Sequence, residues 1–173
     1  MTEDKAYSQQ NRWFFEGLIS AVSAGFFFVL VGVIFVINQG LVGGISDFGK
    51  DFVLVRVANT NTSFPVPATP AAHTVVYTAA FEFALGIAIL QVAILAARLL
   101  TGSRRRRIAQ TVGSLVFWSG SAYLLTTLVD MKSTLAISQQ LTVWYEFWAA
   151  IIVVFGISIV IRSVAFFFVA RKG

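Results

Sequence analysis

Residues 17–37 decide the fold, and they read GLISAVSAGFFFVLVGVIFVI. No charged side chain interrupts this run, and a helix needs about 20 apolar residues to cross the roughly 30 Å hydrocarbon core of a bilayer. Residues 21–24 loosely resemble a signal-peptide cleavage site, but the run is longer than a signal core and its most hydrophobic half follows that point. We therefore expect a membrane-spanning helix that stays in the protein.

Three further runs have the same character. We expect spans at residues 13–38, 74–97, 108–129 and 141–169, with Glu82 inside the second and Glu146 and Arg162 inside the fourth. The whole chain is 57% hydrophobic and only 12% charged, which leaves too few polar side chains to cover a water-soluble domain of this size. The predicted fold class is therefore a single all-α integral membrane domain, a bundle of four transmembrane helices.

Basic residues predict the orientation, because lysine and arginine in short loops favour the cytoplasmic side. Of the 13 basic residues, three fall on one side of the spans, Lys50, Arg56 and Lys132. The rest fall on the other side: Lys5, Arg12, Arg98, Arg104, Arg105, Arg106, Arg107, Arg162, Arg171 and Lys172. We expect residues 1–12, a basic hairpin at 98–107 and residues 170–173 in the cytoplasm of a multi-pass cell-membrane protein. Residues 39–73 and 130–140 are then outer loops.

The first outer loop is the larger one. Its residues 40–49 are rich in glycine and predict a flexible connection, whereas the β-branched stretch 52–57 predicts a short strand. Residues 59–72 carry three prolines and many threonines, which indicates an irregular lid over the outer helix ends. Asn61 begins a glycosylation triplet on the correct side, and the sequence leaves its use open.

Small residues indicate where helices meet, because lipid already satisfies apolar side chains and close packing drives association in a bilayer. The first two spans each carry small residues at intervals of four, a spacing that also arises by chance: Gly17, Ala21 and Gly25 in the first, Ala80, Ala84 and Ala88 in the second. The third span has two small-residue groups, 113–114 and 119–121. Aromatic residues near Trp13 and Trp144 mark the two membrane interfaces.

The second and fourth spans share a pattern, in which an aromatic-flanked glutamate precedes an arginine by the same interval. Glu82 and Arg98 form one such pair, and Glu146 and Arg162 form the other. Two explanations stand. A duplicated helical hairpin would produce the pattern, as in many transporters, and so would the shared interface chemistry of two helices that run in the same direction.

Glu82 and Glu146 are the candidate functional residues within the spans. Apolar, aromatic surroundings disfavour the charged carboxyl, which is what proton exchange near neutral pH requires, so one hypothesis is a proton- or cation-coupled site. The alternative is structural: each carboxylate could bind the outer loop or pair with Lys132 or Arg56.

Other chemistry has little support in the sequence. The chain has no cysteine and a single histidine, His73, so thiolate, di-iron and haem sites lack their ligands, and we expect neither cofactor nor metal. No histidine or lysine accompanies the serines of the third span, so no serine nucleophile is indicated. The basic cluster Arg104, Arg105, Arg106 and Arg107 is a candidate site for anionic lipid headgroups. No aromatic platform or recognition helix supports nucleic-acid binding.

The layout resembles the tetraspan plan in topology, with four spans, inner termini and a larger first outer loop containing a strand. The cysteines and the tryptophan-glycine-leucine-tryptophan signature of claudin-type proteins are absent, so the resemblance implies no functional residue. We expect a non-enzymatic subunit that packs with lipids and other membrane subunits, identical or different, in a larger complex. The main rival is a small proton- or cation-coupled transporter or channel that uses Glu82 and Glu146, and a lipid-modifying enzyme has the least support.

Overall fold

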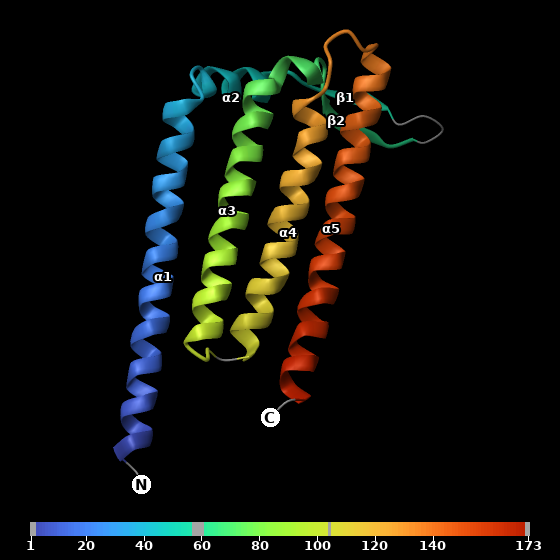
Figure 1. Ribbon diagram of the computed structural model, residues 1–173. Coiled ribbons are helices and arrows are strands. Elements are labelled where there is room, and N and C mark those ends of the chain that lie inside the picture. The colour runs from blue at the N-terminus through green and yellow to red at the C-terminus, as the bar shows by residue number, and fades with distance from the viewer. Residues whose placement is uncertain (1–2, 57–60, 104, 172–173) are drawn as a thin grey trace.

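The computed structural model describes residues 3–56, 61–103 and 105–171. Four long helices dominate it (Figure 1): α1 (Glu3–Ile37), α3 (Thr74–Leu100), α4 (Arg105–Val129) and α5 (Ile137–Arg171). Between α1 and α3 lie a short helix α2 (Leu41–Lys50), strands β1 (Phe52–Arg56) and β2 (Ser63–Pro67), and a 3-10 turn η1 (Pro70–His73). All of these shorter elements gather at one end of the long helices.

The four predicted spans are present as helices long and apolar enough to cross a membrane: Gly17–Ile37, Pro70–Leu100, Arg105–Val129 and Ile137–Phe167. Three helices start earlier than the predicted spans: α1 at Glu3, α4 at Arg105 and α5 at Ile137. The described part of the expected N-terminal tail is therefore helical, because α1 already includes it. The first turn of α1, the last turn of α5 and the α3–α4 hairpin lie at the same end of the helices, opposite the short elements (Figure 1).

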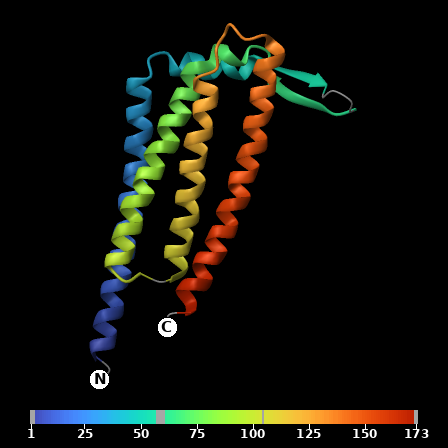
Figure 2. The same ribbon diagram turned by 45° about the vertical axis from the view of Figure 1, so that its right-hand side comes forward.

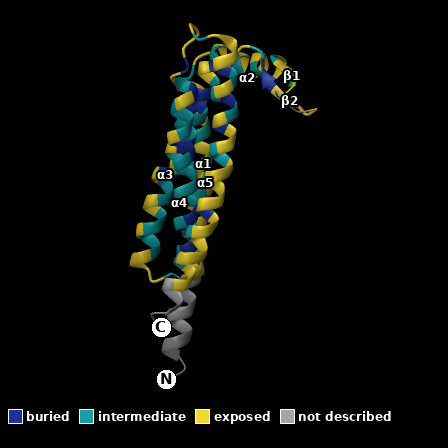
Figure 3. Cartoon of the chain, turned by 90° about the vertical axis from the view of Figure 1, so that its right-hand side faces the viewer, coloured by how far each residue is buried: buried dark blue, intermediate teal, exposed yellow. Residues whose placement is uncertain are grey.

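The long helices stand in a row. Helix α1 packs on α3, α3 on α4, and α4 on α5, and α1 makes no comparable contact with α4 or α5 among the described residues. Figure 2 shows the same succession from a second direction, and seen edge-on in Figure 3 the helices form one layer. The chain therefore has the predicted helices but not the closed bundle, because each helix has only its chain neighbours as major partners.

Glycines allow three close approaches within this row. A side chain at Gly86 of α3 would place its Cβ 2.6 Å from the side chain of Leu30 in α1. On α4, a Cβ at Gly113 would lie 2.9 Å from Cβ of Arg162, and one at Gly120 would lie 2.7 Å from Val154, both in α5. Close backbone contact is the usual basis of helix association in lipid.

Helix α2 corrects one prediction, since the glycine-rich residues 40–49 were expected to be a flexible connection. It follows Gly40, whose φ of +83° is a left-handed conformation that glycine adopts without strain. Leu41, Gly44 and Phe48 have helical spacing and face the protein, while Val42 and Ile45 are exposed. The apolar stripe thus stabilises a helix despite its glycines, each of which costs about 1 kcal/mol relative to alanine.

Strands β1 and β2 form an antiparallel hairpin that projects from the same end (Figures 1 and 2). The first strand was predicted, but the second corrects the expected irregular lid. Prolines occupy two positions of β2, where Pro65 faces Leu54 and Pro67 faces Phe52. A sheet of two strands tolerates them because each strand has one free edge that needs no N–H donor.

The largest buried core lies at this end of the molecule, not midway along the helices. It joins the hairpin to α3, α4 and α5 through buried residues of each: Val66, Tyr77, Leu128, Met131, Trp144 and Phe147. Trp144 was predicted to mark the membrane interface, yet it is only 3% exposed and packs inside this core. We call the shorter elements together with this core the cap.

Candidate functional site

Asp51 holds the cap together. It follows α2 directly, and its Oδ2 accepts hydrogen bonds from the backbone N–H and the hydroxyl of Thr69, both at 2.9 Å. The same oxygen lies 2.8 Å from Nε2 of His73. Its backbone carbonyl accepts a bond from the N–H of Ala68 at 2.9 Å. One residue therefore fixes the end of α2 against the start of the η1 turn.

The charge of Asp51 is stabilised by these donors. Partial burial by itself would raise the pKa of Asp51, but the hydrogen bonds from His73 and Thr69 outweigh it and hold that pKa below its ordinary value. His73 is buried, and its ring packs edge-on against Phe48 with centroids 5.1 Å apart. Sequence reasoning placed His73 at the mouth of the second span but did not single out Asp51.

Among the described residues, Asp51 and His73 do not belong to a cluster of potential metal ligands. Within the part of the chain that the structure describes, no three histidine, aspartate or glutamate side chains come together as metal ligands would. Asp51 and His73 make a pair whose remaining neighbours are Thr69 and aromatic rings. The pair is therefore suited to fixing the cap on the helix ends.

Glu82 lies between α3 and α1. Its Oε2 accepts a hydrogen bond of 2.5 Å from Nδ2 of Asn38, which directly follows α1 and also donates to the carbonyl of Ile34 at 3.1 Å. The partner of Glu82 is thus neither Lys132 nor Arg56, the two cations considered from the sequence. A side-chain amide satisfies the carboxylate and ties the end of α1 to α3.

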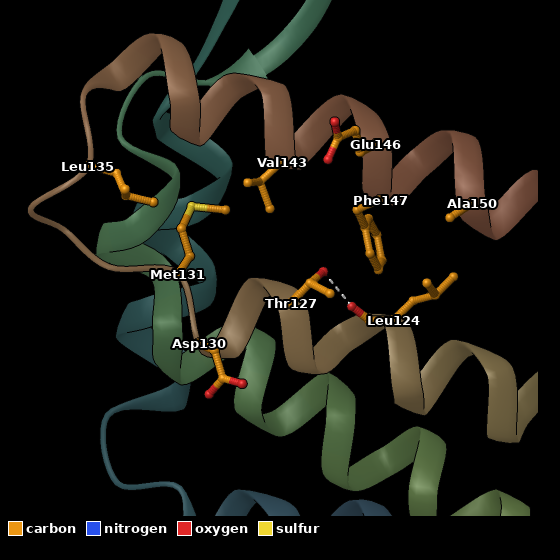
Figure 4. A pocket seen from close by; sticks show the side chains of 9 residues that line it. All are labelled: Leu124, Thr127, Asp130, Met131, Leu135, Val143, Glu146, Phe147 and Ala150. Atoms are coloured by element: carbon orange, nitrogen blue, oxygen red, sulfur yellow. Dashed lines mark hydrogen bonds between the residues drawn. The ribbon is translucent and has the colours of Figure 1, made fainter.

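Glu146 is exposed on α5 and borders an open pocket of about 490 Å³ between α4 and α5. Figure 4 shows Val143, Met131 and Phe147 directed into this space, with Glu146 and Asp130 on opposite rims. The interior is mainly apolar, and the hydroxyl of Thr127 is already bonded to the carbonyl of Leu124 at 2.7 Å. The pocket offers room for an apolar chain beside a carboxylate.

The structure does not bring the two predicted glutamates together. Glu82 belongs to the contact of α1 with α3, and Glu146 belongs to the pocket between α4 and α5. The two carboxyls therefore have different surroundings despite their matching sequence context. No described contact links them into one pathway.

The two small-residue stripes differ in their surroundings. On α3, Ala84 and Ala88 are buried and Ala80 is half-buried. On α1, Gly17, Ala21 and Gly25 are exposed, and a Cβ at either glycine would meet nothing within 4 Å. The small residues of α3 are therefore largely covered by other parts of the chain, whereas those of α1 are exposed.

At the opposite end of the helices, Arg98 closes the hairpin between α3 and α4. Its Nη1 donates to the carbonyl of Arg107 at 2.8 Å and to the hydroxyl of Thr111. Of the predicted lipid-binding arginines, Arg105 and Arg106 are exposed and Arg107 is half-buried, whereas Arg104 lies outside the described residues. The described residues of the basic cluster thus differ in their exposure.

Two pockets open near this basic end. One, of about 390 Å³, lies between α1, α3 and α4 and is lined partly by polar side chains: Ser20, Ser23, Gln91, Arg98, Arg107, Gln110, Thr111 and Ser114. The other, of about 440 Å³, lies between α4 and α5 and is lined by Arg106, Ala109, Arg162, Ser163 and Phe166. Sequence reasoning identified neither, because each combines residues from helices far apart in the chain.

The protein thus has a hydrogen-bonded cap at one end of its helices and a basic opposite end, and its carboxyls Glu82 and Glu146 lie at separate helix contacts. No known protein family, curated protein or solved structure matches the chain, so its functional assignment rests on this geometry.

Proposed function

We propose that the chain is a non-enzymatic, multi-pass subunit of a larger complex in the cell membrane, with its termini and basic hairpin in the cytoplasm. The complex contains either further copies of the chain or different membrane subunits. One observation carries the proposal: α1 contacts the rest of the chain along a single face, and its small residues lie on the opposite face.

The geometry of α1 follows from its helical repeat. At roughly 100° of rotation per residue, Gly17, Ala21, Gly25 and Gly32 fall on one side of the helix. Leu30 and Ile34, which pack on Gly86 and beside Ala79 of α3, fall roughly 180° away. The small residues thus lie on the side of α1 opposite to α3, the one helix that α1 substantially contacts among the described residues.

Exposure of apolar side chains alone would not support a partner, because lipid solvates them well. Glycine is different, since it costs about 1 kcal/mol relative to alanine within a helix and offers lipid nothing in return. Its benefit in membranes is close approach of a second helix. Among the described residues no such helix lies against Gly17, Gly25 or Gly32, because a Cβ at each would meet nothing within 4 Å.

The single layer of helices supports the same conclusion. Among the described residues, each long helix has only its neighbours in the chain as major partners, so no other described helix covers either broad face of the row. Another subunit on the outer side of α1 would extend the row and bury the small residues. The transport hypothesis receives less support, because Glu82 and Glu146 lie at separate contacts.

A photocrosslinking residue at Phe28 tests the proposal. Phe28 is 72% exposed and lies on the small-residue side, whereas its neighbour Phe27 packs against Phe83 of α3 with centroids 5.8 Å apart. Benzoylphenylalanine at position 28 should give adducts of higher mass with another membrane subunit in native membranes. The same group at position 27 should react within the chain.

A matched pair of substitutions adds an independent readout. Gly25→Leu should dissociate the complex in mild detergent, and Gly156→Leu, at an exposed glycine of α5 with no small residue three or four positions away, should not. The proposal is wrong if position 28 gives no intermolecular adduct and the protein at native abundance migrates only as a monomer.

A further inference from the structure

Arg162 occupies an unusual depth. Its Cβ packs over Gly113 of α4, at the place where an alanine Cβ would approach it to 2.9 Å. Gly113 is eight residues into α4, which corresponds to roughly 12 Å of helix from the start of α4. The apolar residues Ile161 and Val164 lie close to Arg162 in the chain. The backbone of this arginine therefore lies well inside the apolar part of the row.

The pocket of about 440 Å³ between α4 and α5 lies beside both Arg162 and Arg106. Both side chains line it, together with Ala109, Ser163 and Phe166, and none of these residues is acidic. Among the described residues, neither Arg106 nor Arg162 has a hydrogen-bond or ion-pair partner. A cation this deep in a span normally has a counter-charge or a polar partner, because its desolvation is costly.

We propose that this pocket binds the phosphate group of an anionic phospholipid, held between the guanidinium groups of Arg106 and Arg162. Guanidinium groups match phosphate oxygens in shape and can donate two hydrogen bonds to one group. The hydroxyl of Ser163 already donates to the carbonyl of Ile159 at 3.0 Å, so the two arginines supply the recognition. Arg162 lies on α5 and was not part of the predicted basic cluster.

The walls of the pocket favour a lipid over a free phosphate. Phe166 lines the pocket and is 50% exposed, so an apolar surface for an acyl chain lies beside the two arginines. Ala109 is buried and forms an apolar part of the lining. Arginine side chains readily extend toward the headgroup level from a deeper backbone position. A phospholipid thereby supplies both the counter-charge and the apolar contact.

Lipid retention in nanodiscs tests this site with the full chain. The protein is reconstituted in phosphatidylcholine with a small fraction of phosphatidylglycerol of the same acyl chains, and bound lipid is quantified by native mass spectrometry. Arg162→Gln and Arg106→Gln should each lower the retained phosphatidylglycerol at least fivefold. Lys132→Gln is the control, because it removes one positive charge from an exposed position at the opposite end of the helices and does not line the pocket; it should change retention less than twofold.

Further arms separate the alternatives. Arg162→Lys keeps the charge and should retain more phosphatidylglycerol than Arg162→Gln, and it also serves if the glutamine variant does not fold. Excess inorganic phosphate should leave the bound phosphatidylglycerol in place. The proposal is overturned if inorganic phosphate displaces the lipid, if phosphatidylcholine is retained equally well, or if Lys132→Gln causes the same loss as the pocket variants.

Discussion

Replacing Gly113 by alanine should weaken the contact between α4 and α5. The new Cβ would lie 2.9 Å from Cβ of Arg162 and 3.1 Å from the carbonyl oxygen of Ser158. Carbon atoms normally approach to about 3.5–4.0 Å, so the helices would have to separate by a good part of an ångström. Neither obstacle can rotate away, because one is a backbone atom and the other is the first atom of its side chain.

The magnitude follows from two opposing effects. Overpacking costs about 1–3 kcal/mol, and alanine regains about 1 kcal/mol of helix propensity relative to glycine. Gly113→Ala should therefore lower the free energy of unfolding by about 0–2 kcal/mol. Gly156→Ala is the control, because a Cβ there meets nothing within 4 Å; it should raise the free energy of unfolding by up to about 1 kcal/mol.

The comparison can be made by steric trapping or by unfolding in mixed micelles of mild detergent and dodecyl sulfate. The informative quantity is the difference between the two variants, expected at about 1–3 kcal/mol, since the propensity effect is common to both. Equal stability of Gly113→Ala and Gly156→Ala would refute the close packing of α4 on α5 described above.

Further predictions concern the hydrogen bonds of the two acidic residues. Asp51→Asn should loosen the cap by about 1.5–3 kcal/mol, measured as faster amide exchange in residues 63–73, while exposed Asp47→Asn should have little effect. Because the pKa of Asp51 is lowered in the folded protein, its contribution should be full above the ordinary aspartate pKa and lost as the pH falls through the lowered value. The acid-induced increase in exchange should be smaller in Asp51→Asn, and an undiminished increase would assign it to other groups. Glu82→Ala should destabilise the protein by about 1–3 kcal/mol because it removes the hydrogen bond that ties Asn38 to α3 and leaves the amide only its bond to Ile34, whereas Glu82→Gln keeps an acceptor and should cost less. If proteoliposomes show proton or cation flux that Glu82→Gln abolishes without loss of folding, the structural role of Glu82 is wrong.

The long helices could be predicted because length and unbroken apolar composition are local properties of the sequence. Their packing could not, since apolar side chains in lipid do not dictate which helices must touch. Helix α2 was missed because its glycines outweighed the spacing of Leu41, Gly44 and Phe48, which in retrospect was the available signal. Strand β2 was missed because Pro65 and Pro67 argue against a strand unless only two strands are present.

The candidate sites, like the fold, could be predicted from the sequence only in part. Glu82 could be identified as unusual because a carboxyl in an apolar run is visible locally, but its partner Asn38 is separated from it by 44 residues. Asp51 carried a weaker signal: an acidic residue directly after an amphipathic helix, followed later by a threonine before proline and a lone histidine. The pairing of Arg106 with Arg162 depends on the contact between α4 and α5, which the sequence did not specify.

The position of the buried core has a consequence for biogenesis. Phe48 and Val66 precede three of the long helices in the chain, yet they pack around Trp144, which lies on the last one. In the proposed orientation, the cap segment emerges on the far side of the bilayer early in synthesis and must wait there until α5 has been integrated. The cap would then fold only after all four long helices have been inserted. A truncated product would expose an unfolded outer segment to quality-control proteases.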